Sequence, residues 1–168
     1  MNTVSLNKEK HKRNLFDCGV EALNNHLCMT ASQESDRDNT RTFVLEDIYN
    51  PESIIGYYTL TVTFIDLSLL PQKLQQKHKY AQSGGLIARL TVDKNYTQQG
   101  FGEWLLIDAL KKLLSASNTV AFPVVIVDAK AGAVQFYEKF GFVPFNDMPN
   151  KLFITIADVK TSLGMKIK

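Results

Sequence analysis

Cysteine is scarce in this sequence. The two cysteines, Cys18 and Cys28, are ten residues apart on what the pattern predicts to be one helix. A helix rises about 1.5 Å per residue, so this separation is too long for a disulfide between them. No spacing of Cys and His matches a zinc site, and we expect no bound metal.

Long apolar runs and a strong charge of either sign are also missing. No run reaches the roughly 18 apolar residues of a membrane span, and the first residues lack the apolar core of a signal peptide. We therefore expect a cytoplasmic protein with no membrane segment. The net charge of +2 does not by itself indicate a nucleic-acid partner. A chain of 168 residues can bury a full core, and we expect one domain over residues 1–168.

Hydrophobic periodicity predicts a mixed α/β fold, with a sheet packed by helices. Helical spacing begins near Asp17, a plausible N-cap, and continues to residue 31. Two further helices are predicted at 101–115 and 131–140. Strands are predicted at 41–47, 53–67, 86–93, 122–129, 141–145 and 150–157. Within the second of these, alternation places Leu60, Val62 and Phe64 on one face and Thr59, Thr61 and Thr63 on the other.

Two glycines, Gly100 and Gly102, lie in "NYTQQGFGEW", between a predicted strand and a long predicted helix. A glycine-rich turn at a helix N-terminus exposes backbone N–H groups that bind phosphate. The Rossmann pattern G-x-G-x-x-G is absent, because Leu105 occupies the third glycine position. The Gly-Lys-Ser/Thr of a P-loop is absent as well. The glycine pair alone is compatible with a phosphate site or with a plain connection.

The surrounding residues resemble a known family. "LTVDKNYTQQGFGEWLLIDAL" is similar to the acyl-coenzyme A signature of the GCN5-related N-acetyltransferase family, Arg/Gln-x-x-Gly-x-Gly/Ala. The signature falls on residues 97–102, where Thr97 replaces the usual Arg or Gln and removes one donor. "VDAKAGAVQFYEKFGFVP" resembles a later segment of the same family. The resemblance implies a mostly antiparallel central sheet with helices on both faces.

One branch of the family is more similar. "FDCGVEALNNHL", "RTFVL", "IIGYYTLT", "LIARLTVD", "VDAK" and "FYEKFGF" occur in the order found in acetyltransferase toxins of toxin–antitoxin modules. The resemblance covers nearly the whole chain. It implies acetylation of the α-amine of aminoacyl-tRNA, which stops translation. It also implies a small ribbon-helix-helix antitoxin as partner, and a homodimer.

The resemblance assigns roles to individual residues. Acetyl-CoA is the implied cosubstrate, and Tyr137 is the implied acid that protonates the leaving thiolate; without that context it reads as a half-buried aromatic. The backbone of Leu90, Thr91 and Val92 would bind the pantetheine amides. The pyrophosphate would lie against the turn formed by Thr97, Gln98, Gln99, Gly100, Phe101 and Gly102. An α-amine has a pKa of about 7.7–8.0, so part of it is neutral at pH 7 and needs no side-chain base.

Basic residues are candidates for contacts with tRNA phosphates. Residues 72–94 and 8–13 are both rich in cations. A basic face is the expected footprint of nucleic acid, although ordinary solvated lysines would look the same. The candidates are Arg89, Lys77, Lys79, Lys12 and Arg13.

Two other functions are compatible with the sequence. The acceptor could instead be a protein N-terminus or a small-molecule amine, for which we would expect a closed, acidic pocket. The chain could also be a degenerate module that binds acyl-CoA or a partner without turnover. The change at Thr97 is compatible with the degenerate module, whereas Gly100, Gly102 and Tyr137 argue against it.

Overall fold

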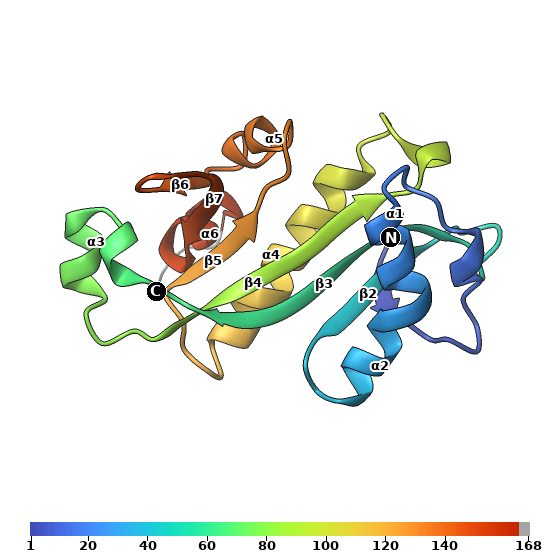
Figure 1. The fold of residues 1–168 in the computed structure, drawn as a ribbon, viewed down its shortest axis with the longest axis horizontal. Coiled ribbons are helices and arrows are strands. Elements are labelled where there is room, and N and C mark those ends of the chain that lie inside the picture. The colour runs from blue at the N-terminus through green and yellow to red at the C-terminus, as the bar shows by residue number, and fades with distance from the viewer. Residues whose placement is uncertain (165–168) are drawn as a thin grey trace. The chain divides into compact units, whose positions relative to one another are not determined.

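A computed structural model describes residues 1–164. The strands lie in one sheet in the order β1-β2-β3-β4-β5-β7-β6. Four pairs of known register are antiparallel, and β4 and β5 pair in parallel. The strands are β1 (Thr3–Ser5), β2 (Arg41–Glu46), β3 (Ile54–Phe64), β4 (Ser83–Val92), β5 (Val124–Asp128), β6 (Val143–Phe145) and β7 (Met148–Thr155). Figure 1 shows β3 and β4 as the two longest strands.

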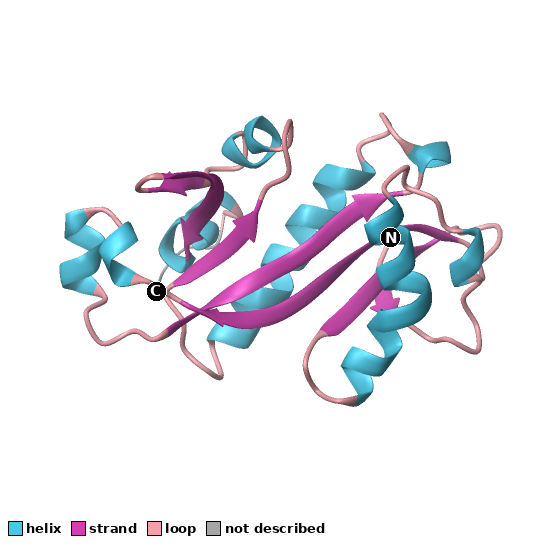
Figure 2. Ribbon diagram, in the orientation of Figure 1, coloured by secondary structure: helices cyan, strands magenta, loops and turns pink. Residues whose placement is uncertain are grey.

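Helices follow β4, β5 and β7 along the chain, and Figure 2 distinguishes helices from strands by colour. The α-helices are α1 (Glu21–Asn25), α2 (Ala31–Asp36), α3 (Gln72–Lys77), α4 (Phe101–Ser117), α5 (Val134–Glu138) and α6 (Ile156–Ser162). A π-helical turn, η2 (His26–Thr30), joins α1 to α2, and η1 (Arg13–Leu15), η3 (Leu67–Leu69) and η4 (Lys94–Tyr96) are 3-10 turns. The mixed α/β class and the mostly antiparallel sheet with flanking helices are confirmed. No helix within residues 1–164 is long and apolar enough to cross a membrane.

The described chain divides into two compact units. The first unit contains Met1–Thr61 and Ala88–Ala109, and the second contains Val62–Ile87 and the chain from Leu110 onward. Three elements, β3, β4 and α4, contribute residues to both units.

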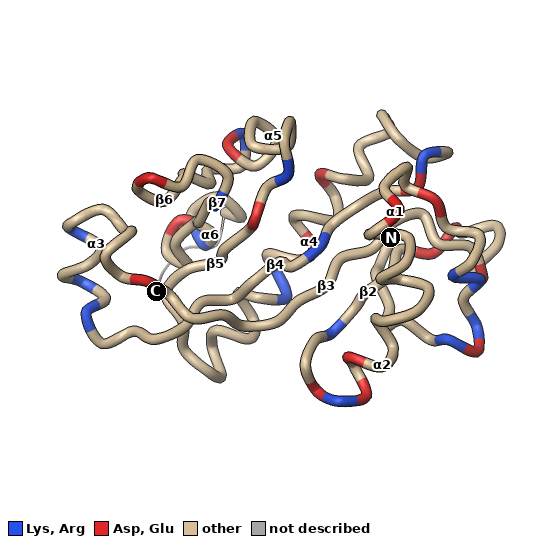
Figure 3. Tube along the Cα trace, viewed as in Figure 1, with Lys and Arg blue, Asp and Glu red and all other residues tan. Residues whose placement is uncertain are grey.

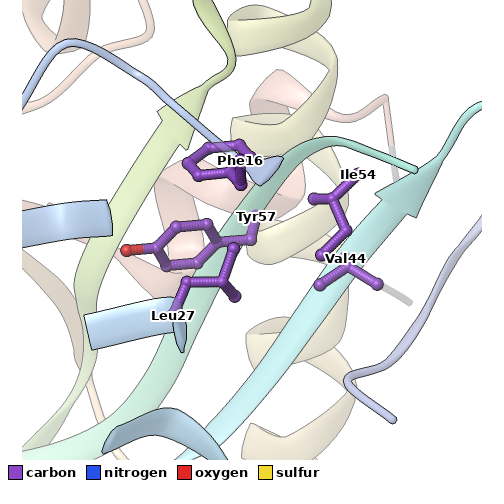
Figure 4. Packing of buried hydrophobic residues seen from close by; sticks show 5 residues of the cluster. All are labelled: Phe16, Leu27, Val44, Ile54 and Tyr57. Atoms are coloured by element: carbon purple, nitrogen blue, oxygen red, sulfur yellow. The ribbon is translucent and has the colours of Figure 1, made fainter. Parts of the chain in front are cut away.

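An aromatic cluster forms the core of the first unit (Figure 4). The rings of Phe16 and Tyr57 meet edge to face with centroids 5.5 Å apart. The Tyr57 hydroxyl donates a hydrogen bond of 2.7 Å to the carbonyl of Leu23 in α1. The buried members of the cluster are Phe16, Leu27, Val44, Ile54 and Tyr57. Apolar burial and the tyrosine hydrogen bond together fix the first helices on the sheet.

The core of the second unit lies between β5, β7 and the η3 turn. Its buried members are Leu70, Val124, Ile126, Phe145 and Phe153. The rings of Phe145 and Phe153 pack with centroids 4.9 Å apart. Asn146 donates its backbone N–H to the carbonyl of Leu69 (2.9 Å) and its side-chain amide to that of Leu70 (3.3 Å). These bonds tie η3 to the turn after β6.

The helix predicted from Asp17 begins later, at Glu21, so the N-cap prediction is wrong. The Asp17 carboxylate accepts the N–H of Gly19 and the side-chain amide of Asn24 instead, and forms an ion pair of 2.9 Å with Lys94. Cys18 therefore precedes the helix. Both cysteines are free thiols.

Burial along β3 does not follow the apolar alternation to the end of the strand. Thr59 is fully buried, and its hydroxyl hydrogen bonds with that of Thr42 at 2.8 Å. Val62 and Phe64 are 61% and 85% exposed, although they continue the apolar alternation from Leu60. A buried hydroxyl is acceptable when it has a partner, and the last residues of a strand can extend beyond the core.

Candidate functional site

The chain after β4 is held by hydrogen bonds on two sides. Asp93 is buried, and its carboxylate accepts the N–H groups of Asp17 (2.9 Å) and Asn95 (2.8 Å). The hydroxyl of Tyr96 donates to the Asp47 carboxylate at 2.6 Å. These contacts fix the η4 turn, so the segment that follows begins at a defined position.

The segment between η4 and α4 contains two left-handed residues. Gln98 has φ of 60° and Gly100 has φ of 83°. A Cβ at Gly100 would meet no heavy atom within 4 Å, so the space around this residue is open. Glycine is thus needed at this position because of its backbone conformation rather than crowding. Residues 97–100 are all exposed, so the turn presents its main chain to solvent.

The N-terminus of α4 directly follows this turn. Trp104 donates the first helical hydrogen bond, to the carbonyl of Gly100 at 3.1 Å. The N–H groups of Phe101 and Gly102 therefore precede the helical ladder. The Phe101 ring packs edge to face on Tyr96 with centroids 6.2 Å apart, which anchors the helix start. Backbone donors and the positive end of the helix dipole coincide here, the arrangement that binds phosphate.

The end of β4 is half-buried over Leu90, Thr91 and Val92. The parallel ladder with β5 joins Gly85–Ile87 to Val125–Val127, and these three residues lie beyond it. On the other side, a Cβ at Gly56 of β3 would lie 2.7 Å from the Thr91 carbonyl oxygen. Gly56 therefore permits the close approach of β3 to β4, a role that the sequence analysis missed. Backbone groups at this end of β4 are suited to hydrogen bonding with amides.

Tyr137 lies in α5 of the second unit and is 8% exposed. Its ring packs edge to face against Phe136 and Phe142, with centroids 5.1 and 5.5 Å away. Burial raises the pKa of Tyr137 to about 12, so the phenol is protonated at neutral pH. No described residue offers its hydroxyl a hydrogen-bond partner.

The surroundings of Tyr137 are compatible with an acid. Its phenol is protonated at neutral pH, and its hydroxyl has no hydrogen-bond partner among residues 1–164. A protonated phenol of this kind can donate a proton to a bound molecule.

The predicted phosphate contacts differ in their surroundings. In the first unit, Lys12 forms an ion pair of 2.6 Å with Glu52, and Arg13 lies half-buried in η1. Arg89 is half-buried in β4, and no described residue forms an ion pair with it. Burial and then the charge of Arg89 lower the pKa of His26 to about 4. In the second unit, Lys77 and Lys79 are exposed in α3 and the turn after it.

A metal site is not found in the described part of the chain. No group of three or more His, Cys, Asp or Glu side chains within residues 1–164 could hold a metal ion.

Comparison with known proteins identifies the family. A model of the acetyltransferase (GNAT) domain matches residues 76–160, half of the chain, and includes β4, α4, β5 and α5. The chain belongs to the acetyltransferase (GNAT) family.

Its relatives include toxins. A probable toxin TacT of Sinorhizobium fredii is 26% identical over 169 residues, which cover 95% of this chain and 93% of that protein. Two solved structures share the fold. A tyrosine-to-phenylalanine mutant of KacT is 27% identical with a TM-score of 0.87, covering 95% of this chain and 97% of that one. AtaT complexed with acetyl-methionyl-tRNAfMet is 26% identical with a TM-score of 0.86, covering 96% and 98%.

The protein is accordingly an N-acetyltransferase that uses acetyl-CoA. The residues around Gly100 fit this cosubstrate, since the turn is open, exposed and followed by backbone donors without helical acceptors. Thr97 occupies the position where the family signature has Arg or Gln. Its hydroxyl donates to the Lys94 carbonyl at 3.2 Å and carries no charge to offer a phosphate.

Proposed function

We propose that this protein transfers the acetyl group of acetyl-CoA to the α-amine of aminoacyl-tRNA, as the toxin of a toxin–antitoxin module. The open left-handed turn at Gly100, ahead of α4, is the observation that supports acetyl-CoA binding. The similarity over nearly the full length to AtaT, which is solved with acetyl-methionyl-tRNAfMet, supports the acceptor. That RNA carries an acetylated α-amine, which is the product expected of such a transfer.

The main chain supplies most of the contacts to acetyl-CoA in this proposal. The N–H groups of the turn and of the first α4 residues bind the pyrophosphate, with contributions from Thr97, Gln98, Gln99, Gly100, Phe101 and Gly102. Main-chain groups of Leu90, Thr91 and Val92 hydrogen bond to the pantetheine amides. Such contacts hold the thioester in place for attack, and positioning of this kind supplies a large part of the rate.

Tyr137 is the proposed general acid. The neutral amine nitrogen forms a bond to the carbonyl carbon of the thioester, and the carbon–sulfur bond breaks. The phenol gives its proton to the departing sulfur, and the nitrogen loses its extra proton to water. The high pKa of Tyr137 keeps the proton in place until negative charge develops on sulfur.

The carboxylates near the strand ends have other partners, which agrees with a mechanism that has no side-chain base. Glu46 pairs with His11 and Lys10, and Asp47 accepts from Tyr96. Asp93 accepts two backbone N–H groups. An α-amine with a pKa of about 7.7–8.0 supplies enough neutral nucleophile near pH 8 by itself.

The remaining parts of the proposal concern assembly. In this proposal residues 1–168 form one catalytic domain, which is supported by the three elements β3, β4 and α4 that contribute to both compact units. The exposed apolar residues Val62 and Phe64 support a homodimer. A ribbon-helix-helix antitoxin is the partner, and the tRNA substrate places the toxin in the cytoplasm. Arg89, Lys77, Lys79, Lys12 and Arg13 contact tRNA phosphates, with Lys12 the weakest candidate because Glu52 neutralises it.

The acceptor is tested by offering acetyl-CoA with each candidate substrate and measuring thiol release. The substrates are a mixture of aminoacyl-tRNAs, the same tRNAs deacylated, an unmodified peptide and a small primary amine. We expect release with aminoacyl-tRNA alone, and an acetylated α-amine in the mass spectrum of the recovered aminoacyl group. Turnover only with the peptide or the small amine would overturn the acceptor assignment, and turnover with none would indicate a non-catalytic module.

A further inference from the structure

An exposed tyrosine lies beside a hollow in the second unit, next to Lys77 and Lys79. Tyr80 is 86% exposed and follows α3. The hollow has a volume of about 410 Å³, within the range of small-molecule sites. Its lining residues are Lys77, His78, Tyr80, Ala81, Ala121, Phe122 and Pro123.

The walls of this hollow are held in place. Phe122 is mostly buried, and a Cβ at Gly85 would lie 2.8 Å from its ring. Pro123 accepts the N–H of Ile156 at 2.8 Å. The turn that carries Tyr80 is closed by the Ala81 N–H, which donates to the His78 carbonyl at 2.8 Å. The hollow is thus bounded by packed and hydrogen-bonded chain on both sides.

The charge around the hollow is positive. Residues 72–92 contain no Asp or Glu, and Figure 3 shows basic segments along α3 and the turn after it. Within residues 1–164, Lys73, Lys77 and Lys79 form no ion pair. Lys79 Nζ lies 5.0 Å from the centre of the Tyr80 ring. Two acids lie near the hollow: Asp158, in the first turn of α6, and Asp66, which follows Ile65, whose N–H donates to the Gln82 carbonyl at 3.1 Å.

His78 adds a polar, uncharged ring to the lining. Burial, and then the charge of Lys77, lower the pKa of His78, so it is neutral at pH 7. The positive charge of the site therefore comes from lysines at its rim, while the interior is aromatic and apolar.

We propose that this hollow binds an unpaired nucleotide of RNA, with the base stacked on Tyr80 and the neighbouring phosphates contacted by Lys77 and Lys79. An exposed aromatic ring flanked by cations is the arrangement that binds single-stranded nucleic acid. An anionic membrane fits less well, because α3 has six residues, of which Leu74 alone is apolar. The identification of the RNA as the tRNA substrate rests on the proposed function, whereas the binding of single-stranded RNA does not.

The test is the affinity of the purified full-length protein for fluorescein-labelled decauridylate, measured by fluorescence anisotropy without acetyl-CoA. We expect Tyr80→Ala to raise Kd about tenfold, and Tyr80→Phe to bind like the wild type because it keeps the ring. Tyr49→Ala is the matched control, since Tyr49 is 91% exposed in the first unit. A Lys77→Ala/Lys79→Ala variant should lower the slope of log Kd against log salt concentration by about 1.4, the value expected for the loss of two phosphate contacts.

Three results with decauridylate overturn the inference: no binding by the wild type, equal binding by Tyr80→Ala, or equal losses in the Tyr80 and Tyr49 variants. Binding to phosphatidylserine vesicles that Tyr80→Ala abolishes, with unchanged decauridylate binding, also overturns it. Tyr80-dependent binding of decauridylate by a protein that does not acetylate aminoacyl-tRNA would refute the proposed function and leave this inference intact.

Discussion

The turn around Gly100 and the side chain of Tyr137 differ in exposure and in the groups that they offer to a bound molecule. The turn is exposed, and it offers main-chain N–H groups whose direction depends on two left-handed residues. Tyr137 is buried against two aromatic rings and offers one side-chain oxygen. The proposed role of the turn depends on its backbone conformation, whereas that of Tyr137 depends on its hydroxyl oxygen alone.

This difference predicts how each region responds to substitution. Side-chain changes in the turn leave the backbone donors in place, so they should alter affinity for acetyl-CoA modestly. Removal of the Tyr137 oxygen leaves the packed ring in place and should affect the reaction rather than the fold. The largest effect is therefore expected at Tyr137 and the smallest at an exposed side chain of the turn.

Tyr137→Phe should lower kcat by roughly 10²–10⁴-fold, the usual contribution of a general acid. The KM for acetyl-CoA should change little, because the proposed cosubstrate contacts come from the main chain of another segment. The melting temperature should also change little, since the lost hydroxyl has no partner among the described residues. Steady-state kinetics and thermal unfolding of the variant and the wild type provide these values.

The pH dependence of kcat/KM in the wild type is a control for that assignment. Burial raises the pKa of Tyr137 to about 12, so the acid stays protonated up to that pH. We expect kcat/KM to rise through the pKa of the α-amine, about 7.7–8.0, and then stay level to pH 10. A falling limb centred below pH 10, or a Tyr137→Phe variant with the wild-type kcat, would show that another group protonates the sulfur.

Much of the fold could be predicted because its main elements have strong local patterns. The helix predicted at 101–115 is α4, Phe101–Ser117, and the apolar run at 122–129 contains β5. Errors occurred where distant residues decide the local structure. β1 was missed because Thr3–Ser5 is too short to show a period and depends on pairing with β2. Asp17 resembled an N-cap, but Lys94, far along the chain, holds its carboxylate.

The candidate site shows the same division. The sequence could indicate an unusual backbone conformation at Gly100, because this conformation depends on the φ angle of the residue itself. The family pattern drew attention to Tyr137. The packing role of Gly56 could not be predicted from the sequence, since it depends on how closely β3 approaches Thr91. The proposed role of Tyr80 could not be predicted either, because its exposure and its neighbours Phe122 and Pro123 are known only from the fold.

Gly100→Ala should raise the KM for acetyl-CoA roughly tenfold with a small change in kcat. Gly100 has φ of 83°, and a left-handed conformation costs a residue with a Cβ about 1–2 kcal/mol. Alanine will shift the free turn away from this conformation, and binding must then restore it. Gly19→Ala is the matched control, since Gly19 has the same φ and the same open surroundings. An equal rise in KM in both variants would mean that general destabilisation, and not the turn, is responsible.

Thr97→Arg should lower the KM for acetyl-CoA by a few-fold, the smallest of these effects. The family usually has Arg or Gln at this position, and here the exposed Thr97 hydroxyl donates to the Lys94 carbonyl instead. An arginine adds a charged donor beside the pyrophosphate, but at an exposed position its contribution is small and screened by salt. Thr97→Glu, the matched variant of opposite charge, should raise KM, and both changes should shrink at high ionic strength. If the two variants changed KM in the same direction, position 97 would not lie near the phosphates, and the placement of acetyl-CoA on this turn would be wrong.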